Sequence, residues 1–317
     1  MSTHQFNELS LSQPILRALA EEGYEHPTPI QRAAIPEVLS GRDVLAAAQT
    51  GTGKTAAFTL PMLQLFSRGL KAVESVRGLV LTPTRELALQ VAESLSNYGR
   101  HLSLHTTVLL GGVSAGPQIT ALRKKPNIVV ATPGRLLDLY RQKELKLDRV
   151  EILVLDEADR MLDMGFSPDV RRIVSATPRS RQTLLFSATL SADISELAHD
   201  MLRDPSQIEV TPPASVSERI DQKVFFVAQE HKRNLLTTVL NDASTHRALV
   251  FTRTKHRANR LTRQLRSGGI KVDVMHSNKG QSARQAALKA FDTGQIKVLV
   301  ATDIAARGID VEDISHV

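Results

Sequence analysis

The 317-residue chain contains no cysteine and no tryptophan, and only 4% of its residues are aromatic. Without cysteine there can be no disulfide framework, no thiol nucleophile and no cysteine-ligated zinc or iron–sulfur site, which fits a reducing cytoplasm. The scarcity of aromatic side chains argues against a protein that reads single strands by base stacking. If the chain binds nucleic acid, we therefore expect contacts to the sugar-phosphate backbone.

Long apolar runs are also missing. No stretch approaches the ~18 consecutive apolar residues that a membrane span requires, and the N-terminal MSTHQFNELS has no basic region followed by an apolar core. We expect neither membrane insertion nor secretion. The composition, with 42% hydrophobic and 23% charged residues, is typical of folded globular proteins. The length favours two domains over one.

The net charge of +7 is unevenly distributed along the chain. Residues 1–205 hold 23 Lys+Arg and 22 Asp+Glu (net +1), whereas residues 206–317 hold 17 and 11 (net +6). A basic region attracts polyanions by counterion release, but many solvated surfaces are also basic. Charge alone leaves both interpretations open. None of the 10 histidines has the spacing of a metal ligand.

A recurring pattern predicts the fold: a short apolar run, then a polar cluster, then a helix-like stretch. Continuous apolar runs indicate strands buried on both faces, as in parallel sheets covered by helices. The first series of runs is Val44–Ala48, Leu79–Leu81, Ile128–Ala131, Ile152–Leu155 and Thr183–Phe186. The second series is Lys223–Val227, Ala248–Phe251, Val272–Met275 and Lys297–Val300.

Turn-forming residues separate the two series. We predict an α/β protein with two doubly wound parallel-sheet lobes, residues 1–210 and 219–317, joined by a linker at 211–218. Ligands of such sheets lie beyond the carboxyl ends of the strands. All the polar clusters fall there, so we expect the functional residues at that edge.

The segment AQTGTGKT, Ala48–Thr55, follows a predicted strand and precedes a helix-like stretch. This is the pattern of a phosphate-binding loop, whose glycines let backbone N–H groups close around phosphate oxygens. Lys54 would reach the β and γ phosphates, and the Thr55 hydroxyl would ligate magnesium. The general pattern begins with glycine, where this chain has Ala48. A plain glycine-rich turn is the alternative.

Four residues, Asp156-Glu157-Ala158-Asp159, end another predicted strand. In a nucleotide-binding fold this position belongs to the magnesium-coordinating aspartate, so we assign Asp156 to the ion. Glu157 would act as general base toward the attacking water. The alternative is a helix N-terminus that carries acidic residues for its dipole.

Two copies of Thr-Pro-x-Arg, Thr82–Arg85 and Thr132–Arg135, follow predicted strands. Threonine suits a helix N-cap and proline the first helical position. The free N–H groups of such helix starts and the added arginine would bind an anion, and two copies side by side would follow successive phosphates. Ordinary helix capping is the alternative. Gly111-Gly112 could allow a close backbone approach or form a plain turn.

The second half has its own basic residues after a predicted strand. Arg253 stands at the strand end and is the better candidate for nucleic acid. Four further arginines recur every three residues, which favours a solvated helix face: Arg257, Arg260, Arg263 and Arg266.

With these motifs in hand, the chain resembles a DEAD-box RNA helicase, nearest the bacterial RhlE-like subgroup, over essentially its whole length. The resemblance is carried, in chain order, by GYEHPTPIQ (Gly23–Gln31) with Phe6 upstream, AQTGTGKT, PTRELALQ, GG, TPGR, DEAD, SAT, VFTRTK, Gln281-x-x-Arg284 and ATDIAARGID. It implies two RecA-like lobes that close around ATP and a single RNA strand. It also implies ATP and Mg as cofactors and RNA as a partner bound without regard to sequence.

The resemblance assigns roles residue by residue. The implied catalytic residues are Lys54, Asp156 and Glu157, with Thr55 and Asp156 at the metal. The implied nucleotide contacts are Phe6, Tyr24, Gln31, Ala48, Gln49, Thr50, Gly51, Thr52, Gly53, Lys54, Thr55, Gly308 and Asp310. The implied RNA contacts are Thr84, Arg85, Gly112, Thr132, Gly134, Arg135, Arg253 and Thr302. Asp159, Ser187 and Thr189 would couple hydrolysis to RNA binding. The amide of Gln31 can recognise adenine bidentately.

One departure from the family is large. The family's closing motif His-Arg-x-Gly-Arg-x-Gly-Arg, whose arginines act on the γ-phosphate, is absent from these 317 residues. The chain ends at Asp-Ile-Ser-His-Val317, at the start of a further predicted strand. We therefore expect a fragment with an incomplete second lobe and impaired turnover. The leading function is an ATP-dependent RNA helicase that unwinds short duplexes locally; an ATP-controlled RNA clamp and a DNA helicase are the alternatives.

Overall fold

The computed structural model describes residues 5–49, 51–67, 75–210, 220–303, 311 and 313–317. The chain divides into two compact units, Met1–Ser215 and Val216–Val317. Each unit has its own sheet and its own core. The predicted linker 211–218 lies outside the described residues, as do three predicted site residues: Thr50, Gly308 and Asp310.

The first unit is built on a seven-stranded sheet in the order β3-β4-β2-β5-β6-β1-β7, and every strand pair in it is parallel. The strands are β1 Val44–Ala47, β2 Gly78–Leu81, β3 Thr106–Leu109, β4 Ile128–Ala131, β5 Ile152–Leu155, β6 Gln182–Ser187 and β7 Ser206–Glu209. The doubly wound prediction is confirmed. The two edge strands, β3 and β7, were not predicted, because each has only one buried residue and no continuous apolar run.

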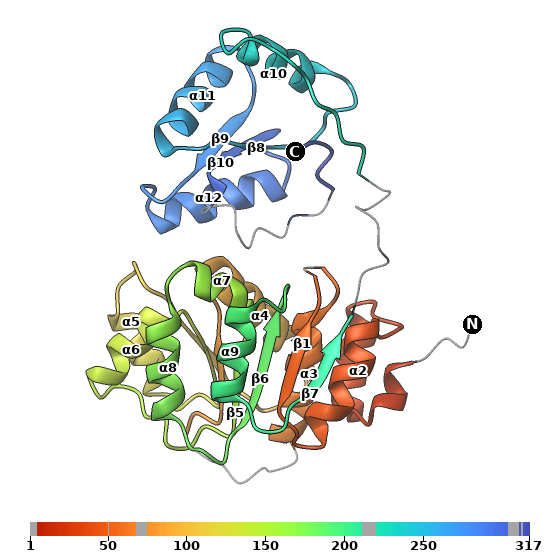
Figure 1. The fold of residues 1–317 in the computed structure, drawn as a ribbon, viewed down its shortest axis with the longest axis vertical. Helices are drawn as coiled ribbons and strands as arrows, with labels where there is room; N and C mark the ends of the chain where they lie inside the picture. Colours follow the sequence, from red (N-terminus) through yellow and green to blue (C-terminus); the bar gives the residue numbers. More distant parts are fainter. Residues whose placement is uncertain (1–4, 50, 68–74, 211–219, 304–310, 312) are drawn as a thin grey trace. The chain divides into compact units, whose positions relative to one another are not determined.

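Helices cover both faces of this sheet (Figure 1). One face carries η1 Phe6–Leu9, α1 Gln13–Glu21, α2 Pro29–Leu39, α3 Lys54–Ser67 and α4 Arg85–Tyr98. The other carries α5 Gly116–Leu122, α6 Pro133–Arg141, α7 Ala158–Asp163, α8 Ser167–Ala176 and α9 Ala192–Met201.

Successive residues of a strand serve the two cores in turn. In β5, Ile152 and Val154 join the core under α1–α4, whereas Leu153 and Leu155 join the core under α5–α9. Strands that must fill both cores have no polar side and read as unbroken apolar runs. This alternation explains why the central strands could be recognised in the sequence.

The second unit has a three-stranded parallel sheet in the order β8-β10-β9, formed by β8 Ala248–Phe251, β9 Val272–Met275 and β10 Val298–Ala301. Helices α10 Lys232–Asn241 and α11 Lys255–Ser267 pack on one face, and α12 Gln281–Asp292 packs on the other. The strand that was predicted to begin at the end of the chain appears as an isolated parallel bridge between His316 and Ala248.

The predicted strand Lys223–Val227 is wrong: these residues form no strand. Their apolar side chains are largely exposed, at 80% for Val224 and 99% for Phe226. β-branched and aromatic residues favour a strand only where a neighbouring strand pairs with it. The outer edge of β8 is already occupied, because Leu249 N donates a 2.9 Å hydrogen bond to His316 O.

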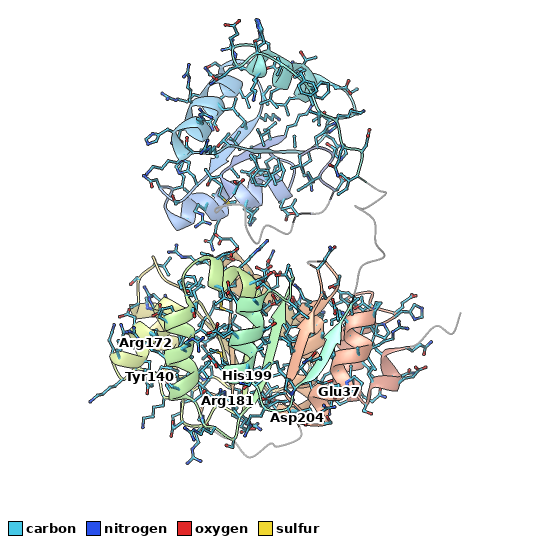
Figure 2. The ribbon with its side chains drawn as sticks, in the orientation of Figure 1. Glu37, Tyr140, Arg172, Arg181, His199 and Asp204 are labelled. Carbon is cyan, nitrogen blue, oxygen red and sulfur yellow. The ribbon has the colours of Figure 1, made fainter. Side chains whose placement is uncertain are left out.

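The amino ends of the first unit's strands are held by structural contacts. Asp43, just before β1, is buried and accepts hydrogen bonds from the backbone N–H groups of Thr183 (2.8 Å) and Arg203 (2.7 Å). The Arg203 guanidinium donates to the carbonyl of Arg181, which lies at this lower end in Figure 2. Burial lowers the pKa of Arg181. Most of these contacts pair buried polar groups within the fold, as in a scaffold, although Arg181 Nε has no partner among the described residues. Among the described residues, no helix combines the length and apolarity needed to cross a bilayer.

Candidate functional site

The predicted functional clusters lie together at the opposite edge of the first sheet. The parallel ladder continues one residue past several strands, which holds the following loops side by side. The backbone bonds are Ala48 N to Ser187 O (3.0 Å), Asp156 N to Leu81 O (2.9 Å), Thr82 N to Ala131 O (3.0 Å) and Thr132 N to Leu109 O (3.1 Å).

Sheet order sorts these clusters into two groups. Strands β3, β4 and β2 are neighbours and lead into the three clusters with predicted RNA roles: Gly111-Gly112, Thr132–Arg135 and Thr82–Arg85. Strands β5, β6 and β1 are neighbours and lead into the acidic cluster, Ser187–Thr189 and the phosphate loop. The sequence order of the motifs does not reveal this grouping.

The phosphate loop ends in a buried, unpaired cation. Gly51 and Gly53 adopt positive φ angles of 80° and 90°, and Lys54 begins α3 with only 6% of its surface exposed. Its Nζ has no hydrogen-bond partner among the described residues. A buried ammonium costs several kcal/mol unless an anion accompanies it, typically ~1 to 3 kcal/mol for each missing hydrogen bond. This geometry fits the phosphates of a nucleotide.

Gln31 connects helix α2 to the phosphate loop. Its Oε1 accepts a 2.9 Å hydrogen bond from Thr28 N, which completes the N-terminal capping box of α2. Its Nε2 donates to Gly53 O at 3.1 Å. A Cβ at Gly53 would collide with this Nε2, so only glycine allows the contact. The predicted adenine-recognition side chain is therefore also a structural link to the loop that would hold the phosphates.

The two aromatic residues assigned to the nucleotide lie in different environments. Phe6 is 4% exposed and belongs to the core under α1–α4. Tyr24 is 46% exposed and makes an edge-on contact with Tyr98, with ring centroids 6.0 Å apart. Tyr24 is therefore accessible to a ligand, whereas Phe6 is buried in the core.

Asp156 is fully enclosed at the end of β5. Burial raises the pKa of its carboxyl group to about 7, with a smaller opposing effect from the Lys54 ammonium and a further rise from the Glu157 carboxylate. A divalent cation beside this carboxylate would remove the electrostatic cost of ionising it. The neighbouring Thr55 hydroxyl, in the first turn of α3, has the oxygen chemistry that Mg²⁺ prefers.

Glu157 has a strained backbone. It adopts the left-handed conformation, with φ 53° and ψ 52°, and is 4% exposed. A non-glycine residue pays about 1 to 2 kcal/mol for this conformation. Arg160 stabilises it, because its Nη1 donates a 2.8 Å hydrogen bond to Glu157 Oε2. Strain of this kind accumulates at functional sites, where the surrounding structure holds it.

The last residue of the acidic cluster reaches the next strand. Asp159 Oδ2 accepts a 3.2 Å hydrogen bond from Ala188 N, in the loop after β6. Beside it, Ser187 is fully buried and its Oγ accepts from Thr189 N at 3.4 Å. The three residues predicted to couple hydrolysis to RNA binding therefore meet in the loop after β6, where Asp159 and Ser187 each accept a hydrogen bond from that loop's backbone.

The two arginines of the Thr-Pro-x-Arg copies converge on a single loop. The Arg85 guanidinium packs against Gly112, where φ is 70° and a Cβ would collide with it. Arg135 Nη2 donates a 2.8 Å hydrogen bond to Val113 O, and its buried Nη1 has no partner among the described residues. The open backbone at Gly134 has nothing within 4 Å of a Cβ. Gly111-Gly112 therefore forms a turn, and the Arg85 guanidinium approaches its backbone closely at Gly112.

The predicted helix caps are half right. Thr132 is the N-cap of α6 and Pro133 its first residue, as predicted. In the other copy the helix starts two residues later: Thr84 is the N-cap and accepts from Leu87 N, while the Thr82 hydroxyl donates to Thr84 O. The two threonines of Thr-x-Thr compete for the N-cap, and the second has the extended backbone that capping requires.

The second unit repeats this local structure. The Thr252 hydroxyl donates to Thr254 O (3.3 Å), and Thr254 caps α11 by accepting from Arg257 N (3.3 Å). Arg253, between the two threonines, is exposed. Thr302 follows the adjacent strand β10 and donates its N–H to Met275 O. Comparing Thr82-x-Thr84-Arg85 with Thr252-x-Thr254-Lys255 could have revealed this repeat from the sequence.

Residues 28–197 match the family described as DEAD/DEAH box helicase. The chain belongs to this family. Residues 231–317 match the helicase conserved C-terminal domain, and the DEAD-box RNA helicase resemblance is confirmed at the level of the family. RNA helicase CrhR of Synechocystis sp. is 45% identical over 316 residues, covering 99% of this chain and 63% of the relative. DEAD-box ATP-dependent RNA helicase CshA of Bacillus cereus is 43% identical over 312 residues, covering 98% and 59%.

Solved structures share the fold of this chain. Saccharomyces cerevisiae Dbp5 bound to RNA and ADP BeF3 has a TM-score of 0.86 at 30% identity, covering 98% of this chain and 78% of that one. A DEAD box protein from Methanococcus jannaschii has a TM-score of 0.62 at 38% identity, covering 98% and 83%. The chain spans about 60% of the length of the two curated relatives named above, at 63% and 59%.

Proposed function

We propose that this protein is a cytoplasmic ATP-dependent RNA helicase of the RhlE-like subgroup, which holds the RNA backbone and unwinds short duplexes locally. One observation carries the proposal. The buried, unpaired Lys54 ammonium and the enclosed Asp156 carboxylate interact electrostatically at the carboxyl edge of the sheet, beside arginines that converge on one backbone loop. The amino-acid sequences of the motifs support the assignment to the RhlE-like subgroup.

The roles of the residues follow from their chemistry. Bound ATP with magnesium would supply the phosphoanhydride bond and a divalent charge beside it. Lys54 Nζ would hold the phosphates, and the Thr55 hydroxyl with the Asp156 carboxylate would hold the ion. Glu157 would take a proton from water at its carboxylate. The hydrogen bond from Ala188 N to Asp159 would carry a change at the acidic cluster to the next loop.

RNA-stimulated ATP hydrolysis tests the proposal. We expect single-stranded RNA to accelerate ATP turnover more than DNA of the same sequence, because the 2′-hydroxyl distinguishes the two strands. A strand-displacement assay separates a helicase from an ATP-controlled clamp, which would bind RNA with ATP and leave duplexes intact. Turnover that is indifferent to RNA would overturn the proposal.

The family's closing arginine motif, which residues 1–317 do not include, affects the rate of ATP hydrolysis. Arginines that act on the γ-phosphate contribute roughly 10³ to 10⁵ to phosphoryl transfer. Residues 1–317 hold Lys54, Thr55, Asp156 and Glu157 but not that motif. We propose that these residues bind ATP and turn it over slowly by themselves, so stimulation by RNA is measured as the ratio of the rates with and without RNA.

Gln31→Ala should weaken ATP binding more than GTP binding. A bidentate amide contact to adenine is worth about 1 to 3 kcal/mol, or about 5- to 150-fold in affinity. Loss of the Gly53 link would instead affect both nucleotides alike, so titration calorimetry with both separates the two roles. Gln182→Ala is the matched control, since this buried glutamine bonds to Val38 O and Arg42 O at the amino ends of the strands. Equal losses for ATP and GTP would remove Gln31 from base recognition.

Arg85→Ala and Arg135→Ala should weaken RNA binding for all sequences alike. Each phosphate neutralised on a single strand contributes about −0.7 to the slope of log affinity against log salt, so each variant should flatten that slope by about 0.7. Anisotropy titrations at several salt concentrations measure it. Arg149→Ala, an exposed arginine just before β5 at the amino end, should leave the slope unchanged. A loss restricted to particular bases would contradict backbone recognition.

A further inference from the structure

Helix α11 is strongly basic and has no acidic residue to balance it. Its 13 residues include five Lys or Arg and no Asp or Glu. Like charges three or four residues apart repel by about 0.2 to 0.5 kcal/mol per pair, and basic residues in the first turn oppose the helix dipole. Four of the arginines are exposed: Arg257, Arg260, Arg263 and Arg266. The prediction that these arginines are solvent-exposed is confirmed. They do not share a single face, because each step of three residues falls about 60° short of a full turn, so the four arginines span half of the helix circumference.

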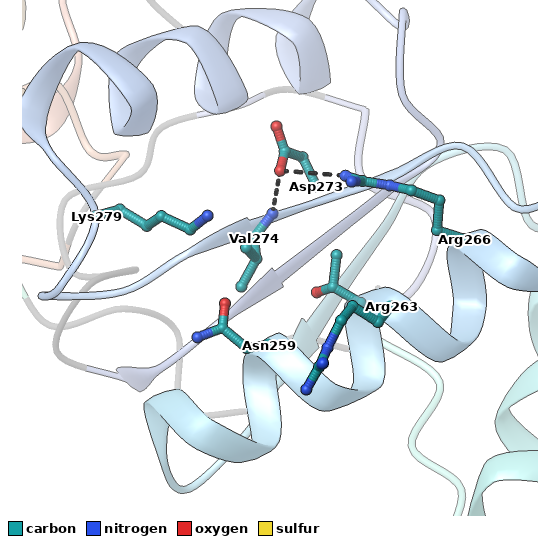
Figure 3. A pocket seen from close by; sticks show the side chains of 7 residues that line it. Asn259, Arg263, Arg266, Asp273, Val274 and Lys279 are labelled. Atoms are coloured by element: carbon teal, nitrogen blue, oxygen red, sulfur yellow. Dashed lines mark hydrogen bonds and ion pairs between the residues drawn. The ribbon is translucent and has the colours of Figure 1, made fainter.

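Two of these arginines line a pocket. It has a volume of about 360 Å³ and lies between α11 and β9 with the loop that follows it (Figure 3). The helix contributes residues at the spacing i, i+3, i+4, i+7, which places them on one face. The lining residues are Asn259, Thr262, Arg263, Arg266, Asp273, Val274 and Lys279.

The pocket has an excess of two positive charges, from three cations and one carboxylate. The carboxylate of Asp273 is paired with Arg266, because Arg266 Nη2 lies 3.6 Å from Asp273 Oδ1. The same nitrogen donates a hydrogen bond to Val272 O. Figure 3 shows this pair on one side of the pocket and Lys279 extending toward Val274 from the other. Arg263 and Lys279 form no ion pair within the described residues. Their charges are available to an anion.

The pocket adjoins the proposed RNA contacts of the same unit. Lys255 Nζ, in the first turn of α11, donates a 3.1 Å hydrogen bond to Asn278 Oδ1, next to Lys279. The pocket is anchored at its inner end, because Asn259 Oδ1 lies 3.0 Å from Nε2 of the buried His276. The hydrogen bond from Lys255 therefore connects the start of α11, two residues after Arg253 in the chain, with the loop that carries Lys279.

We propose that this pocket, beside α11 and β9, binds a backbone phosphate of the RNA strand further along from the proposed contacts Arg253 and Thr302, which follow β8 and β10. The inference rests on the proposed RNA-binding function and extends it to a longer footprint. An arginine fork and an ammonium on opposite walls suit a phosphate group. The pocket has no aromatic lining residue on which a base could stack.

The test compares RNA length. The double variant Arg263→Ala/Lys279→Ala and the unmodified 317-residue protein are titrated by anisotropy with uridine oligonucleotides of increasing length. We expect equal affinities for the shortest oligonucleotide that binds, and an advantage of the unmodified protein for longer ones. For each phosphate that the double variant no longer neutralises, this advantage should shrink about 2.6-fold between about 50 and about 200 mM salt.

The control is Arg257→Ala/Arg260→Ala, which removes two charges from the same helix at positions that do not line the pocket. It should leave the length dependence unchanged. If the unmodified protein binds no RNA, the proposed function itself fails, and the pocket proposal with it. If RNA binds but the pocket variant keeps the full affinity at every length, only the pocket proposal is overturned. An equal loss in the control pair also overturns it, because the effect would then be one of net charge.

Discussion

Replacing Glu157 by glutamine should lower ATP hydrolysis by about 10² to 10⁴ while leaving ATP binding intact, because a positioned general base contributes about that factor. Glutamine keeps the size of the side chain and an oxygen that can still accept the hydrogen bond from Arg160 Nη1. Glutamine has the same unbranched Cβ as glutamate, so the substitution adds no steric strain to the left-handed backbone, where φ is 53°. What it cannot do is take a proton from water. Single-turnover hydrolysis with protein in excess registers even slow rates, and titration calorimetry measures binding.

Glu151→Gln is the matched control for this substitution. Glu151 lies at the other end of β5 and receives a two-pronged hydrogen bond from Arg77, with distances of 2.7 and 2.9 Å. Both glutamates are therefore paired with an arginine and flank the same strand. Glu151→Gln should lower stability slightly and leave hydrolysis unchanged. If Glu157→Gln hydrolyses ATP at the unmodified rate, the proton acceptor is another group.

Several strands could be predicted because burial in the core requires apolar side chains along the strand. β4 and β5, inside the seven-stranded sheet, and β8 and β9, in the three-stranded sheet, were predicted with the bounds that they have in the structure, because each is an apolar run followed by a polar cluster. Residues 223–227 have the same composition and form no strand. Composition reports the propensity of a segment, whereas a strand also needs a partner edge, which only the tertiary structure supplies.

The candidate site was predictable in its membership but not in its connections. Motifs identified Gln31, Gly112 and Arg135 as separate candidates. The structure shows that Gln31 bonds to the phosphate loop and that Arg135 holds the loop after β3. The link from Arg135 depends on sheet order, which places β3 beside β4. The pocket beside α11 has a sequence signal in its i, i+3, i+4, i+7 spacing, but only packing shows which face of the helix is hollow.

The enclosed carboxylate of Asp156 should make stability fall as pH rises. Its pKa is about 7 in the folded protein, against an ordinary value of 3.8. The folded state therefore binds the proton more tightly than the unfolded chain across the window from about pH 4 to about pH 7. Stability rises with pH only where the unfolded state binds more protons, so here this group lowers the free energy of unfolding as pH increases. The difference between these two pKa values corresponds to about 4 kcal/mol above pH 7.

Asp156→Asn should remove that dependence. Asparagine is neutral throughout, so the variant should match the unmodified protein near pH 4 and exceed its unfolding free energy by up to about 4 kcal/mol at about pH 8, both in buffer with a chelator. Urea denaturation at several pH values measures the difference between the two proteins, in which the titration of all other groups cancels. Magnesium should then stabilise the unmodified protein at the higher pH and not the variant, because only the ionised carboxylate attracts the cation. Parallel pH profiles for the two proteins would show that Asp156 ionises in the folded state as easily as in the unfolded chain.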